Sequence, residues 1–235
     1  MGQSNSNHLS LDQITFENVS VFIEGFDPIL QSVDIEIPMD QTIVLESSNP
    51  AHAVHLLSVL AGRQAPQSGR IIWNEFNLFD SEEDVLPRQK LIGSYFEHQR
   101  PQPDATILTI LTQSCERKQV LKEARDHFEF TPALLQKKFR DVTYEVQKLV
   151  MLIAATLNQP QMLTLEDPAV GMNEKTFLDY LDWIQLMQRR GHLRHIFLTN
   201  NHPAALRHLE SSKLFVEDGL LYLEDEENFK KAVHF

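Results

Sequence analysis

Cysteine, long apolar runs and positive charge are all scarce in this chain. A single cysteine, Cys115, stands among 235 residues, which excludes a disulfide framework within the chain and fits a reducing cytosol. No run of about 18 apolar residues occurs, and residues 1–10 are polar. We therefore expect neither a membrane span nor a secretory signal.

The charge balance is acidic. Lysine and arginine number 21 against 33 aspartates and glutamates, for a net charge of -12. Because nucleic-acid binding needs a basic field, this balance argues against a nucleic-acid partner. With 42% hydrophobic and 23% charged residues, the composition is that of a soluble protein, long enough for one α/β domain with a small insertion or for two small domains.

The first part of the chain alternates apolar and polar residues. Residues 14–22 and 32–37 follow this pattern, which predicts an antiparallel pair of strands. Residues 41–48 are a denser apolar strand, and after Pro50 the apolar spacing becomes helical until Gly62. In this order of strand, loop and helix, amides at the helix start can hold an anion.

A helical stretch separates the later strands. Residues 70–74 and 91–97 are predicted strands, and the helical spacing of residues 106–140 predicts a compact insertion. The other elements that we expect are a helix at 144–157, a helix opening at Glu174, a core strand at 194–200 and a hairpin around Asp218 and Gly219.

The most informative stretch is QMLTLEDPAVGMN, residues 161–173. A short apolar run ends in Glu166 and Asp167, and proline, glycine and asparagine follow. The pattern predicts a buried strand that delivers two carboxylates at its carboxyl end, which is the ligand-binding edge of an open α/β sheet.

The order of these elements resembles the nucleotide-binding domain of ATP-binding cassette (ABC) transporters. The resemblance is carried by ITFENVSVF, SVDIEIP, HLLSVLAGRQAPQSGRIIWN, IGSYFE, PQMLTLEDP and HIFLTNNHPAAL, in the family's order. It implies a P-loop NTPase-like α/β fold with a mixed central sheet, an antiparallel β subdomain and a small helical insertion. Residues 11–235 would form this domain, with the insertion at about 98–157 and a flexible N-terminus at 1–10. The alternative is an unrelated α/β domain with chance matches.

The family's phosphate loop, G-x-x-x-x-G-K-[ST], falls by this resemblance on the residues before LLSVLAG. Ser47 and His52 then stand at the glycines, Ala53 at the lysine that reaches the phosphates, and Val54 at the hydroxyl that ligates magnesium. Pro50 removes one amide donor, and Ala53 loses a charge-assisted contact. We therefore expect no cofactor, although ATP and magnesium are the ligands that the family implies.

The family's signature, LSGGQ, falls on residues 142–146. Thr143 keeps a hydroxyl and can cap a helix, whereas Tyr144 and Glu145 replace two glycines. Two such domains pair head to tail in the family, and each ATP site combines one phosphate loop with the partner's signature. Because both halves depart from the family here, both sites would be compromised in a homodimer and in a heterodimer with an intact partner.

Three further positions follow from the resemblance. Glu97 stands for the Q-loop glutamine, and Asn200 stands for the switch histidine, with His202 two places later. The aromatic position that stacks on adenine falls on Phe22 or Ile23, and the register does not decide between them.

The acidic pair departs least from the family, which has aspartate followed by glutamate. Glu166, with Glu97, would then lie at magnesium positions, and Asp167 at the catalytic carboxylate that polarises water. The exchange moves each carboxylate by about one methylene, and a shift near 1 Å can cost about 100-fold in rate. The pair can instead cap or order a loop, and we favour that role because the phosphate loop is altered.

Other candidate ligands are weaker. His52 and His55 share a helix face and, with His98 or Glu166, are candidates for a metal site, but a filled pocket is favoured because no complete ligand set is present. Cys115 lies in a helical apolar pattern, and we expect it to be a core residue.

These residues predict a pseudo-ATPase with the family's shape. We expect it in the cytoplasm, peripheral on the inner face of a membrane. It would dock on a membrane permease through the groove of the helical insertion, lined by residues 97–111 and the following helices, or on a second ABC ATPase-like subunit, as a homo- or heterodimer. The alternatives are a divergent but active ABC ATPase and a soluble binding module of the same fold.

Overall fold

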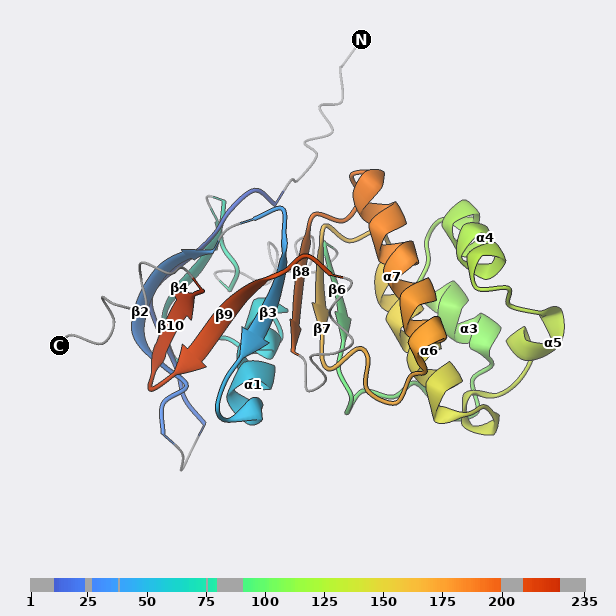
Figure 1. Ribbon diagram of the computed structural model, residues 1–235, viewed down its shortest axis with the longest axis horizontal. Helices are drawn as coiled ribbons and strands as arrows, with labels where there is room; N and C mark the ends of the chain where they lie inside the picture. Colours follow the sequence, from blue (N-terminus) through green and yellow to red (C-terminus); the bar gives the residue numbers. More distant parts are fainter. Residues whose placement is uncertain are drawn as a thin grey trace, which may run out of the picture.

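The structure is a computed structural model that describes residues 11–23, 27–37, 39–74, 76–79, 91–199 and 209–224. In Figure 1 an antiparallel sheet lies at one end, a mixed sheet runs through the middle, and helices α3 to α7 gather at the other end. The predicted α/β fold, with a mixed central sheet and an antiparallel β subdomain, is confirmed. Residues 1–10 and the switch position Asn200 lie outside the described residues.

The antiparallel sheet has the strand order β2-β1-β4-β5. The predicted pairing of its first two strands is confirmed by the register Ile14↔Ile37. Its strands are β1 (Ile14–Val21), β2 (Leu30–Ile37), β4 (Ser68–Trp73) and β5 (Phe76–Asn77).

The central sheet has the strand order β10-β9-β3-β8-β7-β6, parallel except for the edge strand β10. Its strands are β3 (Thr42–Glu46), β6 (Ile92–Tyr95), β7 (Met162–Leu165), β8 (His195–Thr199), β9 (Ser212–Glu217) and β10 (Leu220–Leu223). All residues of β7 and β8 are buried, as expected for strands covered on both faces. The predicted hairpin is β9–β10, and it turns at Asp218 and Gly219.

The helices occur where the apolar spacing predicted them. They are α1 (Pro50–Leu60), α3 (Ile107–Gln113), α4 (Lys118–His127), α5 (Pro132–Leu135), a 3-10 turn (Phe139–Asp141), α6 (Tyr144–Thr156) and α7 (Glu174–Arg189). Thr143 caps α6 by accepting a hydrogen bond from the Val146 amide, as predicted. Cys115 differs from its prediction, because it lies in the connection after α3 and is half-buried against the apolar core.

Two apolar clusters stabilise the described part of the chain. One joins the antiparallel sheet and α1 to the central sheet, and the other joins α3, α4, α6 and α7 to it. Strands β3, β7 and β8 contribute residues to both clusters. Burial of these side chains is the main stabilising contribution to such a fold. Among the described residues, no helix combines the length and apolar character that crossing a membrane requires.

Candidate nucleotide site

The segment at the phosphate-loop position is short. β3 ends at Glu46 and α1 already begins at Pro50, so only Ser47, Ser48 and Asn49 connect them. The amides from Ser48 to His52 all have internal acceptors. Ser48 N–H donates to Glu217 Oε1, Asn49 N–H to Ser47 Oγ (3.3 Å), Ala51 N–H to Asn49 Oδ1 (3.1 Å) and His52 N–H to Asn49 O (2.9 Å). Pro50 has no amide hydrogen. An anion would therefore have to displace an existing hydrogen bond to reach any of these amides.

A carboxylate already binds the connection. Glu217, the last residue of β9, accepts from the Ser48 amide and, through Oε2, from the Ser48 hydroxyl at 2.7 Å. Ser47 is held in turn by a hydrogen bond from its hydroxyl to the Val216 carbonyl oxygen, at 2.7 Å. Glu217 thus offers anionic oxygens where a phosphate would, and its charge repels a second anion at the same place.

The residues at the lysine and magnesium-hydroxyl positions belong to α1. Ala53 is 3% exposed and packs in the apolar cluster with Leu56 and Leu57, while Val54 is half-buried. Burial lowers the pKa of His55, and the charge of His52 lowers it further, so the His55 ring favours its neutral form. Among the described residues, no group of three or more His, Cys, Asp or Glu side chains is arranged to hold a metal ion.

The acidic pair lies where the sequence predicted it, at the carboxyl end of β7. Glu166 Oε2 accepts a hydrogen bond from the Glu97 amide at 2.8 Å. Asp167 has a positive φ of 43°, and its amide donates to Thr199 Oγ1 at 3.1 Å. Glu166 and Asp167 therefore order the segments that follow β6 and β7. These contacts support the loop-ordering role that the sequence analysis favours for the pair.

Glu97, at the Q-loop position, is surrounded by donors. Its Oε1 accepts from Tyr95 Oη at 2.8 Å and from Lys148 Nζ, and its Oε2 accepts from Tyr144 Oη at 2.8 Å and from an Arg100 nitrogen at 3.2 Å. A carboxylate has about four lone-pair sites, and these four donors use them all. Glu97 could bind magnesium only by giving up some of these hydrogen bonds.

The charges in this cluster are coupled. Burial raises the pKa of Glu97, but hydrogen bonds from Lys148, Tyr95 and Tyr144 outweigh it, and the pKa ends below its usual value. Burial lowers the pKa of Lys148, whose side chain is fully buried, and the Glu97 carboxylate opposes that shift. Burial and the hydrogen bond to Glu97 both raise the pKa of Tyr95. The lowered pKa keeps Glu97 ionised at neutral pH and the raised pKa keeps Tyr95 neutral, while Lys148 Nζ contacts the Glu97 carboxylate.

Lys148 is the member of this network that the sequence did not indicate. It lies on α6 four residues after Tyr144, so the two side chains share one helix face. A lysine among the apolar residues of an amphipathic helix was the available signal. Its ammonium also donates to the Asp167 carbonyl oxygen at 2.7 Å, which connects the Q-loop position to the segment after the acidic pair.

The remaining predicted residues lie apart from this network or outside the described residues. Phe22 follows β1, is 40% exposed, and donates its amide to Gln67 Oε1 at 2.8 Å. Asn200 and His202 belong to the part of the chain that the structure does not describe. Thr143 caps α6, and Glu145 on the same helix accepts from the Asn173 amide at 3.0 Å, which orders the segment before α7.

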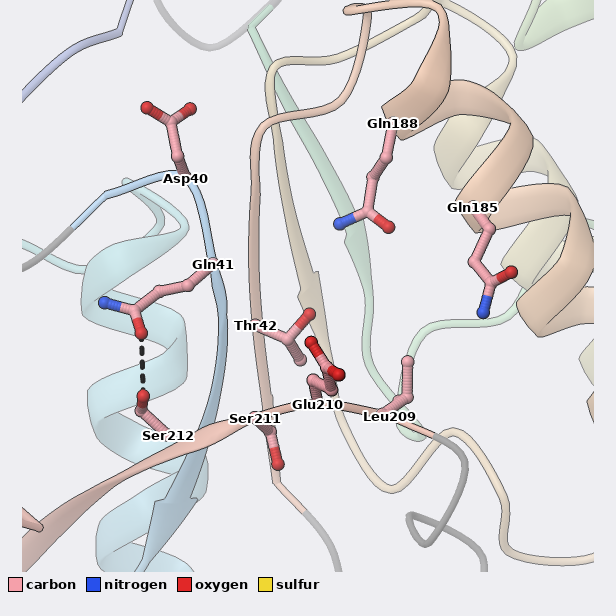
Figure 2. A pocket seen from close by; sticks show the side chains of 9 residues that line it. All are labelled: Asp40, Gln41, Thr42, Gln185, Gln188, Leu209, Glu210, Ser211 and Ser212. Atoms are coloured by element: carbon pink, nitrogen blue, oxygen red, sulfur yellow. Dashed lines mark hydrogen bonds between the residues drawn. The ribbon is translucent and has the colours of Figure 1, made fainter.

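A polar cleft lies at the end of the central sheet where the parallel strands begin, opposite their carboxyl ends. Figure 2 shows Gln185 and Gln188 of α7 facing Thr42 at the start of β3 and Glu210 before β9. Its volume is about 640 Å³. Because β3 and β9 are parallel to β7 and β8, their starts and the acidic pair occupy opposite edges. The cleft is thus separate from the candidate nucleotide site.

Comparison with known protein families shows which family this chain belongs to. The family model described as "ABC transporter" matches residues 30–170. The chain belongs to the ABC transporter family. Within that family it is 25% identical over 200 residues to the sulfate/thiosulfate import ATP-binding protein CysA of Synechocystis sp., a match that covers 82% of this chain and 55% of that protein. It is 24% identical over 179 residues to the molybdenum import ATP-binding protein ModC of Vibrio parahaemolyticus, covering 74% and 48%.

One ABC relative is matched over more of its length. A putative ABC transporter ATP-binding protein of Nostoc sp. is 22% identical over 222 residues, covering 90% of this chain and 80% of that protein. In contrast, the chain spans about half the length of the CysA and ModC proteins that it matches.

Solved ABC structures have the same fold. The dimeric structure of MJ0796, a bacterial ABC transporter cassette, superposes with a TM-score of 0.74 at 15% identity, covering 90% of this chain and 97% of that chain. An ATP binding subunit of an ABC transporter gives a TM-score of 0.75 at 14% identity, covering 94% and 92%. The likeness extends over nearly all of each compared chain.

Proposed function

We propose that this chain is a nucleotide-binding-domain-like subunit of an ABC transporter that neither binds Mg-ATP tightly nor hydrolyses it. The observation that carries the proposal is the connection between β3 and α1, in which every amide from Ser48 to His52 already donates to an internal acceptor. Glu217 adds a negative charge at the same place. The family's chemistry needs free amides in this connection, a lysine at the position of Ala53 and a hydroxyl at the position of Val54, and this chain has none of the three.

The proposal extends to the other half of a nucleotide site. Tyr144 and Glu145 stand at the glycines of the signature, and each is engaged within the chain, Tyr144 with Glu97 and Glu145 with the Asn173 amide. A head-to-tail homodimer would therefore combine an occupied loop with an altered signature at both sites. A heterodimer with an intact partner would have the occupied loop in one site and the altered signature in the other. Both the homodimer and the heterodimer therefore argue against ATP hydrolysis.

The role left to such a subunit is structural or regulatory. We infer a single ABC-type domain over residues 11–235, with its helical insertion at about 98–157. It docks on a membrane permease through the insertion, on the cytoplasmic face of the membrane, and pairs with a second ABC ATPase-like subunit. The names of the relatives, which are ATP-binding proteins of importers, favour a transporter as the host complex.

A hydrolysis assay tests the proposal. Purified protein with Mg-ATP is expected to release phosphate no faster than its Asp167→Asn variant, because no catalytic carboxylate is in use. Faster release by the parent protein, abolished by Asp167→Asn, would contradict the proposal.

The second candidate function is a divergent but active ABC ATPase. It is favoured by the relatives, which are named as ATP-binding proteins, and by the two carboxylates at the end of β7. It predicts that the parent protein releases phosphate faster than its Asp167→Asn variant. A soluble binding module of the same fold is the third candidate. It predicts that no multi-span membrane protein co-purifies with the chain from membranes.

A further inference from the structure

The helical insertion is joined to the central sheet by two chain segments that run side by side. The leaving segment follows β6 and leads into the insertion. The returning segment leads from the insertion through the 3-10 turn into α6. Between them, Ile107 N–H donates to Lys137 O (3.0 Å), Phe139 N–H to Ala105 O (2.8 Å) and Arg140 N–H to Pro103 O (3.1 Å), around the bridge Thr106↔Lys138. Because backbone hydrogen bonds connect the two segments, one cannot move without the other.

The same two segments are connected a second time, close to the central sheet. Glu97, on the leaving segment, accepts hydrogen bonds from Lys148 and Tyr144 of α6, the helix that the returning segment enters. The Lys148 side chain is 0% exposed, and its ammonium also donates to the Asp167 carbonyl oxygen at 2.7 Å. One buried cation therefore holds the segment after β6, the segment after β7 and helix α6 together.

Separating these segments would carry a large cost. A buried ammonium that loses its carboxylate is an uncompensated charge, which is far less favourable than the intact pair. Arg100 reinforces the contact from outside, 5.6 Å from the Tyr144 ring centroid. Leu111 and Val120 of the insertion also share one apolar cluster with Leu165 of the sheet. Polar and apolar contacts therefore favour the same arrangement.

We propose that Glu97, Lys148 and Tyr144 form an internal latch that fixes the helical insertion on the central sheet in one orientation without any ligand. Glu97 and Tyr144 of the latch stand at the positions that the family resemblance assigns to the Q-loop and the signature, so those two positions serve the chain's own rigidity. The proposal concerns the ligand-free chain, and its failure would leave the proposal about ATP untouched.

Distance measurement between two spin labels tests the latch. In a Cys115→Ser background, Lys122→Cys on α4 and Leu220→Cys on β10 place labels on the insertion and on the sheet, both at exposed positions. We expect one narrow distance distribution, unchanged by Mg-ATP. Glu97→Gln should broaden or shift it, and should speed hydrogen exchange of the Phe139 amide by about tenfold or more.

Asp104→Asn is the matched control. Asp104 lies in the same leaving segment and pairs with Lys138 (2.9 Å) and Arg140 (3.0 Å), but its side chain is exposed, so its loss should change neither readout. Should Glu97→Gln fail to fold, Tyr144→Phe removes one hydroxyl and should give a smaller change in the same direction. A parent distribution with two populations, or a folded latch variant with the parent's distribution and exchange rate, would overturn the proposal.

Discussion

The carboxylate of Glu217 accepts hydrogen bonds from both the backbone amide and the hydroxyl of Ser48. These residues are 169 positions apart, and their contact closes the connection between β3 and α1 with the chain's own negative charge. In a member of the ABC transporter family, this is the place where the fold offers an anion its amides. The contact is the physical reason for regarding the site as internally occupied.

Glu217→Ala should destabilise the chain only modestly. The variant releases the Ser48 amide and hydroxyl to water rather than leaving them buried, because Ser48 is exposed, so we expect a loss of about 0.5–1.5 kcal/mol in the free energy of unfolding. Urea denaturation measures this loss. The variant should still not bind Mg-ATP, since Ala53 and Val54 are unchanged; tight binding on this single substitution would mean that Glu217 alone closes the site.

Lys148→Met should destabilise the chain far more. It removes the buried cation of the pair and leaves the partly buried Glu97 with Arg100 as its charged partner, and breaking a buried pair costs roughly 3–5 kcal/mol. The double variant Glu97→Gln with Lys148→Met should lose less than the sum of the two single losses, because the charge left unpaired in each single variant is absent. Lys175→Met, which breaks an exposed pair with Asp179, is the control and should change little. Additive losses in urea denaturation would show that the two side chains do not interact.

The Glu97 carboxyl should make stability depend on pH in the acidic range. Its pKa in the folded chain lies below the ordinary value of 4.5, so its ionised form stabilises the fold above that value. This contribution is lost as the pH falls through the folded pKa. We expect unfolding free energies of the parent and Glu97→Gln to differ most near pH 7 and to converge as the pH falls below 4.5. A difference that grows as the pH falls would contradict the assigned direction.

Gly171→Ala should be poorly tolerated because of Tyr144. Gly171 has φ of 74°, and a methyl group there would lie well inside contact distance of the Tyr144 ring. We expect a loss of about 1–3 kcal/mol from the strained backbone and the overlap together. In a Tyr144→Ala background the overlap disappears, and the same substitution should cost less. An equal loss in both backgrounds would show that Tyr144 does not restrict this position.

The sequence predicted the fold better than it predicted the site. The buried run before Glu166, the helical spacing of α6 and α7, and the Asp218–Gly219 turn are local patterns, and each occurs as expected. The contacts of Glu97 with Lys148 and of Ser48 with Glu217 join residues 51 and 169 positions apart. No local periodicity encodes such pairs, because they depend on how separate elements pack. Composition alone could not indicate that these carboxylates would be used internally.

The measurement that most directly tests the account is a calorimetric titration of the parent protein with ATP in excess magnesium. The account predicts no saturable heat at ligand concentrations up to about 1 mM, which corresponds to binding weaker than roughly 4 kcal/mol. Saturable binding at micromolar concentrations, with one nucleotide per chain, would show that the amides between Ser48 and His52 are available after all and would contradict the central claim.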